Sequence, residues 1–257
     1  MKIRYYIIFV IFYSLLQGCK KENSTPQTNY QSGVVISFDD DFVEEWFKVN
    51  DTLLPFDWKA TFFLTQFQKF EPAKLLKIKR LKELGHEIGG HGFMHLNAQT
   101  FCSKFGTNEY LNQEISPMLV AMNKEDIFPT SFAYPFGARN PEVDNELLKK
   151  FDMIRGTTYG NENPANQKCY FNNNRLVFGL GLDNHYSHFS IPYFISLLKY
   201  AKDMNKIVVF YAHKPATIFQ NKYETEYKTL IEICRYVKNN KMKFYKMSEL
   251  DHLLNNN

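Results

Sequence analysis

The chain has 257 residues, of which 44% are hydrophobic and 16% aromatic, and its formal net charge is +4. A chain of this length can bury one sizeable core, so we expect a single globular domain and a monomer. Basic and acidic residues are nearly balanced, and no basic block is interleaved with aromatic residues. This composition argues against binding to nucleic acid.

The N-terminus predicts export. Lys2 and Arg4 precede an apolar run, Tyr5 to Leu16. This run is too short to span a bilayer permanently and is typical of the hydrophobic region of a signal peptide. Leu16-Gln17-Gly18-Cys19 follows it and resembles a bacterial lipobox. The alternative is a short buried helix that ends in Gly-Cys.

These features predict three segments. We expect residues 1–18 to be a lipoprotein signal peptide and Cys19 to carry the lipid that anchors the protein to a membrane. Residues 19–32 are predicted to be a flexible tether, because they are polar and lack a core pattern. Residues 33–257 would form the folded domain. Such a protein would lie in the bacterial cell envelope, on the periplasmic or cell-surface face of a membrane.

Strand-like and helix-like segments alternate after residue 33. The strand-like runs are residues 33–38, 60–64, 130–134 and 207–211, and the helix-like stretches are residues 73–84, 141–151 and 226–239. This alternation predicts parallel β/α units. Catalytic groups collect at the C-terminal ends of the strands in such units. Residues 161–174, which are rich in Asn, predict a long surface loop.

Two polar motifs follow apolar runs. Asp39 and Asp40 end the first predicted strand, and His91 and His95 come about fifty residues later. We interpret the histidines as an i, i+4 pair on a helical turn, which would present both rings on one face. One carboxylate and two imidazoles bind a divalent transition metal and leave positions open for water and substrate. The second carboxylate supplies a base, so the two motifs together predict a metal-hydrolase site.

With these motifs the chain resembles a NodB-type polysaccharide deacetylase, a group also called carbohydrate esterase family four. The first family motif, a strand ending in Phe-Asp-Asp, matches Phe38-Asp39-Asp40, and the second, His-x-x-x-His, matches His91 and His95. The third motif ends in Pro-aromatic-Gly and matches Tyr134-Pro135-Phe136-Gly137. The fifth, an apolar strand ending in His, matches residues 208–213.

The resemblance implies a fold and a reaction. The fold is α/β, a distorted and incomplete parallel β/α barrel that occupies residues 33–257. The reaction is metal-dependent removal of acetyl groups from an N-acetylated or O-acetylated polysaccharide, with release of acetate. Asp40, His91 and His95 would hold the metal. Zinc is the expected metal, and the same ligand set also accepts cobalt, nickel or iron.

The resemblance also implies roles for the other matched residues. Asp39 would act as the general base and His213 as the general acid. Tyr134, Pro135 and Phe136 would contact the substrate and its oxyanion, with the backbone N–H of Phe136 as the donor.

The chain departs from the family pattern at two positions. Gly92 stands where the second motif usually has Ser or Thr, whose hydroxyl braces the loop. Ala133 stands where the third motif commonly has an Arg that contacts the catalytic carboxylate, which is Asp39 in this chain. A cation beside a carboxylate lowers its pKa and fixes its rotamer. Arg139, Arg155 or Arg175 would have to substitute, and the sequence does not decide among them.

Three assignments stay open at this level. Asp183 is the best candidate for a carboxylate that orients His213, although an ordinary loop Asp fits the sequence as well. Besides Cys19, the cysteines are Cys102, Cys169 and Cys234, which allow at most one disulfide among them. The function also has two alternatives: an amidase that acts on a non-sugar amide, or an envelope carbohydrate-binding lipoprotein with a decayed site.

The remaining histidines are expected to be structural. We predict a hydrogen-bonded role for His86 and loop packing for His185 and His188, although the last two share a loop that could reach a substrate cleft.

Overall fold

The computed structural model describes residues 30–160 and 162–254. The predicted signal peptide, Cys19 and most of the predicted tether lie outside this range. Among the described residues, no helix combines the length and the apolar character that crossing a bilayer requires.

Parallel strands and helices alternate along the domain, as the sequence predicts. The strands are β1 (Gly33–Asp40), β2 (Thr61–Leu64), β3 (Glu87–Gly90), β4 (Ser131–Ala133), β5 (Met153–Thr158), β6 (Leu176–Gly181), β7 (Ile207–Ala212), β8 (Lys214–Ala216), β9 (Glu224–Glu226) and β10 (Lys243–Tyr245). The α-helices are α1 (Val43–Leu53), α2 (Pro72–Glu83), α3 (Ala98–Phe105), α4 (Thr107–Tyr110), α5 (Ser116–Asn123), α6 (Pro141–Leu147), α7 (Ile191–Asp203), α8 (Tyr227–Asn239) and α9 (Asp251–Leu254). Short 3₁₀ turns at Leu54–Phe56, Phe67–Lys69, Pro135–Gly137, Pro164–Asn166 and Met247–Leu250 and a π-helical turn at Leu111–Ile115 complete the chain.

Strands β1 to β7 form a parallel barrel. They follow one another in chain order, and β7 pairs back with β1 through the register Gly33–Ile207 to Phe38–Ala212. Strand β10 pairs with the first residues of β1, below the point where β2 joins. The barrel is distorted between β3 and β4, where the register pairs Gly90 with Phe132 alone. The predicted distorted, incomplete β/α barrel is therefore confirmed.

Side chains of each strand alternate between two cores. Val34, Ile36 and Phe38 of β1 face outward and belong to the large core between the strands and the helices. Val35 faces inward and belongs to a smaller core inside the barrel. Because the side-chain period of a strand is two, Asp39 also points into the barrel, one step beyond the last apolar layer.

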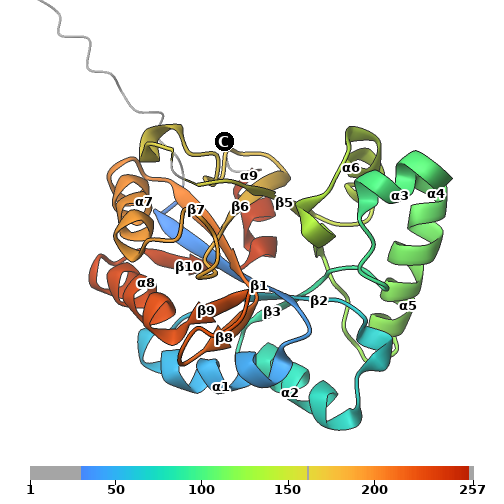
Figure 1. The fold of residues 1–257 in the computed structure, drawn as a ribbon, viewed down its shortest axis with the longest axis horizontal. Helices are drawn as coiled ribbons and strands as arrows, with labels where there is room; N and C mark the ends of the chain where they lie inside the picture. The colour runs from blue at the N-terminus through green and yellow to red at the C-terminus, as the bar shows by residue number, and fades with distance from the viewer. Residues whose placement is uncertain (1–29, 161, 255–257) are drawn as a thin grey trace, which may run out of the picture.

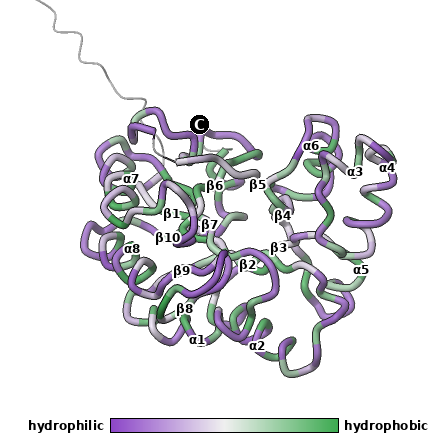
Figure 2. The backbone as a smooth tube through the Cα atoms, in the orientation of Figure 1, coloured by the Kyte–Doolittle hydropathy of each residue, from purple (hydrophilic) through white to green (hydrophobic). Residues whose placement is uncertain are grey.

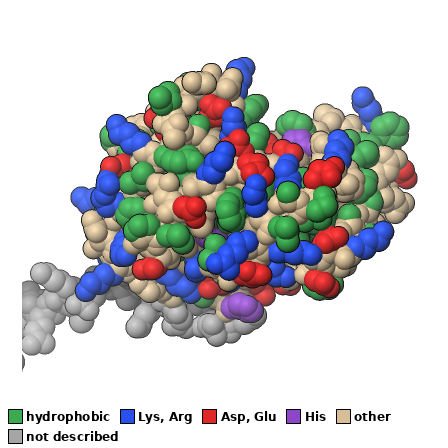
Figure 3. Space-filling model, turned by 90° about the horizontal axis from the view of Figure 1, so that it is seen from below, with side chains coloured by type: hydrophobic (Ala, Val, Ile, Leu, Met, Phe, Trp, Pro, Cys, Tyr) green, Lys and Arg blue, Asp and Glu red, His purple; other side chains and the backbone are tan. Residues whose placement is uncertain are grey.

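Helices cover the outside of the barrel unevenly. In Figure 1, α7, α8, α1 and α2 surround one side, whereas α3 to α6 form a group beyond β3 and β4. The tube in Figure 2 carries hydrophilic and hydrophobic positions along the same helices, as expected where one helix face packs against the sheet. The face in Figure 3 intersperses Lys and Arg with Asp and Glu and shows no block of one sign.

The Asn-rich segment is only partly the surface loop that its composition predicts. Cys169, Tyr170 and Phe171 are buried, and Tyr170 forms an antiparallel bridge with Val208 of β7. The apolar side chains in this segment decide its position, because burying them outweighs the turn preference of the neighbouring Asn residues.

Candidate metal and catalytic site

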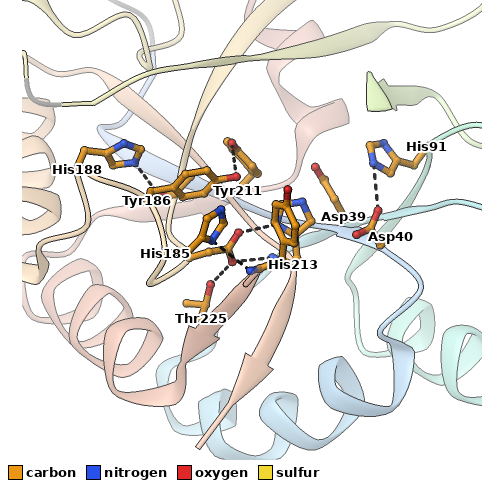
Figure 4. Close-up of polar contacts among 12 residues, drawn as sticks. Asp39, Asp40, His91, His185, Tyr186, His188, Tyr211, His213 and Thr225 are labelled. Carbon is orange, nitrogen blue, oxygen red and sulfur yellow. Dashed lines mark hydrogen bonds and ion pairs between the residues drawn. The ribbon is translucent and has the colours of Figure 1, made fainter. Parts of the chain in front are cut away.

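A cavity of about 290 Å³ opens at the C-terminal ends of the barrel strands. It brings together residues from β1, the β3–α3 loop, the turn after β4, β5, the β6–α7 loop, β7 and the β8–β9 loop. Its lining consists of Asp39, Asp40, His91, His95, Phe136, Gly137, Thr157, Tyr159, His185, Tyr186, Tyr211, His213 and Tyr223. Figure 4 shows the polar groups of the β1 and β7 ends converging.

Asp40, His91 and His95 form a group suited to a metal ion. Their candidate ligand atoms all lie within 4.8 Å of one another. Asp40 Oδ1 is 3.2 Å from His95 Nε2 and 3.6 Å from His91 Nε2. Burial tends to raise the pKa of Asp40, but His95, His91 and His213 outweigh it and lower this pKa to about 2. The carboxylate is therefore ionised, as a ligand must be.

The tautomer of His91 supports this assignment. Its Nδ1 lies 2.8 Å from the backbone carbonyl of Ala133, which can only accept, so Nδ1 carries the proton and donates it. Burial lowers the pKa of His91 to about 4, although Asp39 and Asp40 oppose the shift, so the ring is neutral at neutral pH. The bare Nε2 then faces an ionised oxygen of Asp40. Two acceptors in that arrangement fit a cation between them.

The predicted helical turn for the histidine pair is wrong. Residues 91–97 form an irregular loop, with φ of +88° at Gly92 and +66° at His95. These two left-handed residues reverse the chain, so the loop brings the rings of His91 and His95 to 5.0 Å between centroids. A turn that contains glycine, and not a helix, brings the two histidines together across their four-residue spacing.

Glu114 braces this loop from inside the protein. It lies in the π-helical turn before α5 and is 0% exposed. Its carboxylate accepts hydrogen bonds from the backbone N–H of Met94 at 2.8 Å and of Leu96 at 2.7 Å. A Cβ on Gly92 would lie 2.1 Å from Glu114 Oε1. The side chain that the family pattern places at Gly92 is therefore incompatible with the position of Glu114, which supplies the brace in its place.

Asp39 is paired with a buried arginine. Arg155 is 0% exposed, and its Nη2 lies 2.5 Å from Asp39 Oδ2. The other oxygen, Asp39 Oδ1, is buried and has no hydrogen-bond partner within residues 30–160 and 162–254. Of the other two candidates for this pairing, Arg139 pairs with Asp144, and Arg175 donates to backbone carbonyls just before β5.

The register explains why Arg155 can replace an arginine at position 133. Ala133 and Arg155 are paired residues of β4 and β5, so they occupy the same level inside the barrel. Space for the arginine stem comes from Gly179 of β6, where an added Cβ would lie 3.1 Å from Arg155 Cδ. The guanidinium also lies 4.8 Å from the ring centroid of Tyr211. The cation that pairs with Asp39 therefore comes from β5 instead of from the neighbouring position on β4.

His213 is held on the other side of the cavity by Asp183. Asp183 Oδ2 lies 2.6 Å from His213 Nδ1, while Oδ1 accepts from the His213 backbone N–H at 3.1 Å and from Thr225 Oγ1 at 2.6 Å. Figure 4 labels His213 and Thr225, which take part in these contacts. Trp46 Nε1 donates to the carbonyl of His213 at 2.8 Å, which fixes the backbone. Asp183 therefore orients His213, the role for which the sequence offered it as a candidate.

Neighbouring carboxylates raise the pKa of His213. Burial alone would lower its pKa, but the charge and hydrogen bond of Asp183, with smaller contributions from Asp39 and Asp40, raise it to about 9. Nδ1–H donates to Asp183, so the remaining Nε2–H of the imidazolium is the proton available to a ligand.

The third motif divides between interior and cavity. The ring of Tyr134 is 0% exposed, and its hydroxyl donates to Asp144. Pro135 is buried as well. Phe136 instead lines the cavity with its ring 4.6 Å from that of His95. Only the last of the three predicted substrate residues thus presents its side chain to the cavity.

The other histidines have distinct environments. His86 is buried and accepts at Nδ1 from the backbone N–H of Ala60, while Nε2 contacts Asn50 Oδ1 at 3.0 Å, which confirms a structural role. His188 is buried and contacts the carbonyl of Gly181, whereas His185 lines the cavity. Within the described residues, the three cysteines have free thiols and no disulfide: Cys102, Cys169 and Cys234.

Comparison with known proteins agrees with this architecture. Residues 27–153 match the family model for polysaccharide deacetylase. Over 133 residues the chain is 29% identical to the peptidoglycan-N-acetylglucosamine deacetylase PgdA of Listeria monocytogenes. That stretch covers 51% of the chain and 27% of PgdA, so the chain spans about a quarter of the length of this relative.

Solved structures share the barrel over most of the chain. The chitin deacetylase of the fungal pathogen Colletotrichum lindemuthianum superposes with a TM-score of 0.58 at 15% identity, covering 87% of this chain and 89% of that one. A family 4 acetyl xylan esterase from Clostridium thermocellum, in complex with a cobalt ion, gives a TM-score of 0.52 at 17% identity and covers 86% and 90%. At these identities the likeness shows the fold. The chain is thus similar to polysaccharide deacetylases over about half of its length, and it shares its barrel fold with the solved structures.

Proposed function

We propose that the protein is a metal-dependent hydrolase that removes acetyl groups from an acetylated polysaccharide of the bacterial cell envelope and releases acetate. The observation that carries the proposal is the arrangement of one cavity. Asp40, His91 and His95 form a candidate metal site, and a buried carboxylate and a protonated imidazole, Asp39 and His213, line the same cavity.

A divalent metal ion held by Asp40, His91 and His95 would polarise the acetyl carbonyl and make a nearby water molecule more acidic. Asp39 takes the proton of the attacking water. Its Oδ2 is held by Arg155, so Oδ1, which has no partner within the described residues, is the oxygen that receives the proton. The buried pairing with Arg155 offsets the cost of keeping this carboxylate away from solvent.

His213 acts on the leaving group. With a pKa raised to about 9, its ring is protonated at neutral pH and can donate to the departing sugar amine. By family analogy, the backbone N–H of Phe136 binds the oxyanion, an interaction that contributes roughly 2.7–4 kcal/mol in comparable sites. The products are acetate and a free amino sugar, or a free hydroxyl where the substrate is an acetyl ester.

A lipid anchor on Cys19 is compatible with action on a polymer. Strand β1 runs from Gly33 to Asp40 at the cavity, so the chain enters the barrel at the end opposite the site. A tether of residues 19–32 would then join the domain at the end opposite the cavity. Mass spectrometry of protein isolated from its native envelope tests the anchor, since an unmodified Cys19 or cleavage elsewhere would refute it.

Acetate release tests the function. Purified protein with measured metal content would be offered peptidoglycan, chitin oligomers, poly-N-acetylglucosamine, acetylxylan and simple non-sugar amides. Acetate from an acetylated glycan supports the proposal. Hydrolysis of the simple amides alone would identify an amidase, and glycan binding with neither metal nor acetate release would identify a decayed carbohydrate-binding protein.

A further inference from the structure

Two aromatic rings stand at the cavity beside the two halves of the site. Phe136 packs its ring 4.6 Å from His95, on the side of the candidate metal ligands. Tyr223, in the loop between β8 and β9, packs its ring 5.1 Å from His213 and 4.6 Å from His185. Their exposed fractions are 66% and 48%, so the fold gains little from burying either ring.

Both residues adopt a backbone conformation that aromatic residues rarely take. Phe136 has φ of +61° and Tyr223 has φ of +62°, in the left-handed region that favours glycine. Such strain concentrates at ligand clamps and active sites, because the surrounding structure must impose it. A glycine would relieve the strain at either position, yet each position carries a large ring that remains half-exposed.

The surrounding structure holds Tyr223 firmly. Its backbone N–H donates to His185 Nδ1 at 3.2 Å, and its carbonyl accepts from the backbone N–H of Lys214 at 3.0 Å. The next residue, Glu224, is 3% exposed, and its carboxylate accepts from the backbone N–H groups of Gln220 and Asn221. The loop that carries the ring is therefore fastened before any ligand arrives.

The same segment is joined to the general acid. Thr225 donates to Asp183, the carboxylate that orients His213. Tyr223 consequently has a fixed position relative to the proton donor, close to where the leaving amine of a substrate would lie.

We infer that Tyr223 is a sugar-binding residue, which forms with Phe136 the two walls of a clamp for the pyranose ring that bears the acetyl group. This inference rests on the proposed function. The faces of a pyranose ring present C–H groups, which pack on aromatic rings, whereas its hydroxyl edges can stay hydrated. The cavity of about 290 Å³ lies at the lower end of the sizes that ligand cavities reach, so it accommodates one sugar and not a polymer.

The neighbouring sugars of a polymer must then lie on the rim. Tyr159, just beyond β5, also lines the cavity and is 87% exposed. We assign this ring to the adjacent sugar residue. Together the three rings favour binding of an extended glycan and disfavour binding of a small amide.

Ring removal at Tyr223 tests the clamp. Tyr223→Asn removes the ring but keeps a residue that tolerates left-handed backbone, and Tyr223→Phe keeps the ring. The substrates are a trimer of β-1,4-linked N-acetylglucosamine and para-nitrophenyl acetate, which has no sugar. Tyr223→Asn should lower kcat/KM for the trimer about tenfold more than for the ester, and Tyr223→Phe should restore the trimer value to within about twofold. Equal losses on the two substrates would overturn the clamp.

Tyr159→Ala and a matched control complete the kinetic test. Tyr159→Ala should raise KM for the trimer more than for the N-acetylglucosamine monomer. Phe128→Ala removes a similarly exposed ring that precedes β4, at the opposite end of the barrel, and should change neither KM. A Tyr159→Ala variant indistinguishable from Phe128→Ala would remove Tyr159 from the proposal.

Calorimetric titration of the trimer separates failure of the clamp from failure of the proposed function. Acetate release by the wild type with equal trimer affinity in wild type and Tyr223→Asn would refute the clamp alone. Absence of acetate release together with weakened trimer binding in Tyr223→Asn would refute the deacetylase function and leave the clamp standing.

Discussion

Removal of Arg155 is expected to destabilise the barrel strongly. Arg155 is 0% exposed and Asp39 is 3% exposed, and their side chains pair at 2.5 Å inside the barrel. Arg155→Met keeps most of the apolar stem and deletes the charge. It leaves the Asp39 carboxylate buried without its counter-charge, and that loss is the main cost of the substitution.

The magnitude follows from the burial of both partners. Breaking a buried ion pair by removing one partner costs about 3–5 kcal/mol. In a domain of this size each kcal/mol lowers Tm by roughly 2–4 °C, so we expect a decrease of about 6–20 °C. The exposed pair Arg235–Glu232 provides the control, because Arg235→Met removes the same group where such pairs contribute about 1 kcal/mol or less.

Thermal unfolding of Arg155→Met, Arg235→Met and a double variant tests this expectation. Asp39→Asn/Arg155→Met removes both charges and should be more stable than Arg155→Met alone. Ala133→Arg/Arg155→Ala returns the cation to the paired position on β4 and should recover part of the deacetylation activity that Arg155→Ala loses. An Arg155→Met variant with the same Tm as Arg235→Met would refute this expectation. An Asp39→Asn/Arg155→Met variant less stable than Arg155→Met would refute it as well.

Three further predictions concern the neighbouring groups. His95→Ala should release the metal measured by elemental analysis while circular dichroism stays unchanged, and full metal content would exclude His95 as a ligand. Because Asp183 helps to raise the pKa of His213 to about 9, wild-type activity should fall as pH rises through about 9 and the acid loses its proton; in Asp183→Asn this basic limb should move to lower pH, and an unmoved limb would contradict the assignment. Gly92→Ser should weaken metal affinity at least tenfold by displacing Glu114, and Gly92→Ser/Glu114→Ala should recover part of it; equal affinities in wild type and Gly92→Ser would refute the brace.

The sequence was informative wherever chemistry and strand pattern coincide. Asp39 and Asp40 end a continuous apolar run, which predicts a buried strand that delivers both acids to its C-terminal end. His213 was located by its match to the fifth motif of the family, an apolar strand that ends in His, and the structure places it directly after β7. Spacing failed for His91 and His95, because four residues can be closed by a helix or by a turn, and only the glycine at position 92 indicates the turn.

Glu114 was missed because its role depends on a contact over eighteen to twenty residues. It lies within a helical segment, where a lone Glu predicts a solvated face, and nothing local shows that backbone N–H groups point at it. Arg155 was one of three candidates, and the pairing of β4 with β5 selects it. Sheet register is a tertiary property, so only the fold shows that an arginine on β5 can take the place of one on β4.

In the proposed mechanism, Asp39 serves as the base beside a metal held by Asp40, His91 and His95. The most direct measurement is acetate released from an N-acetylated glycan by wild type and by Asp39→Asn, each loaded to the same measured metal content. Turnover by Asp39→Asn should fall by about 10²–10⁴-fold with metal binding retained. Turnover within a fewfold of wild type, at equal metal content, would contradict it.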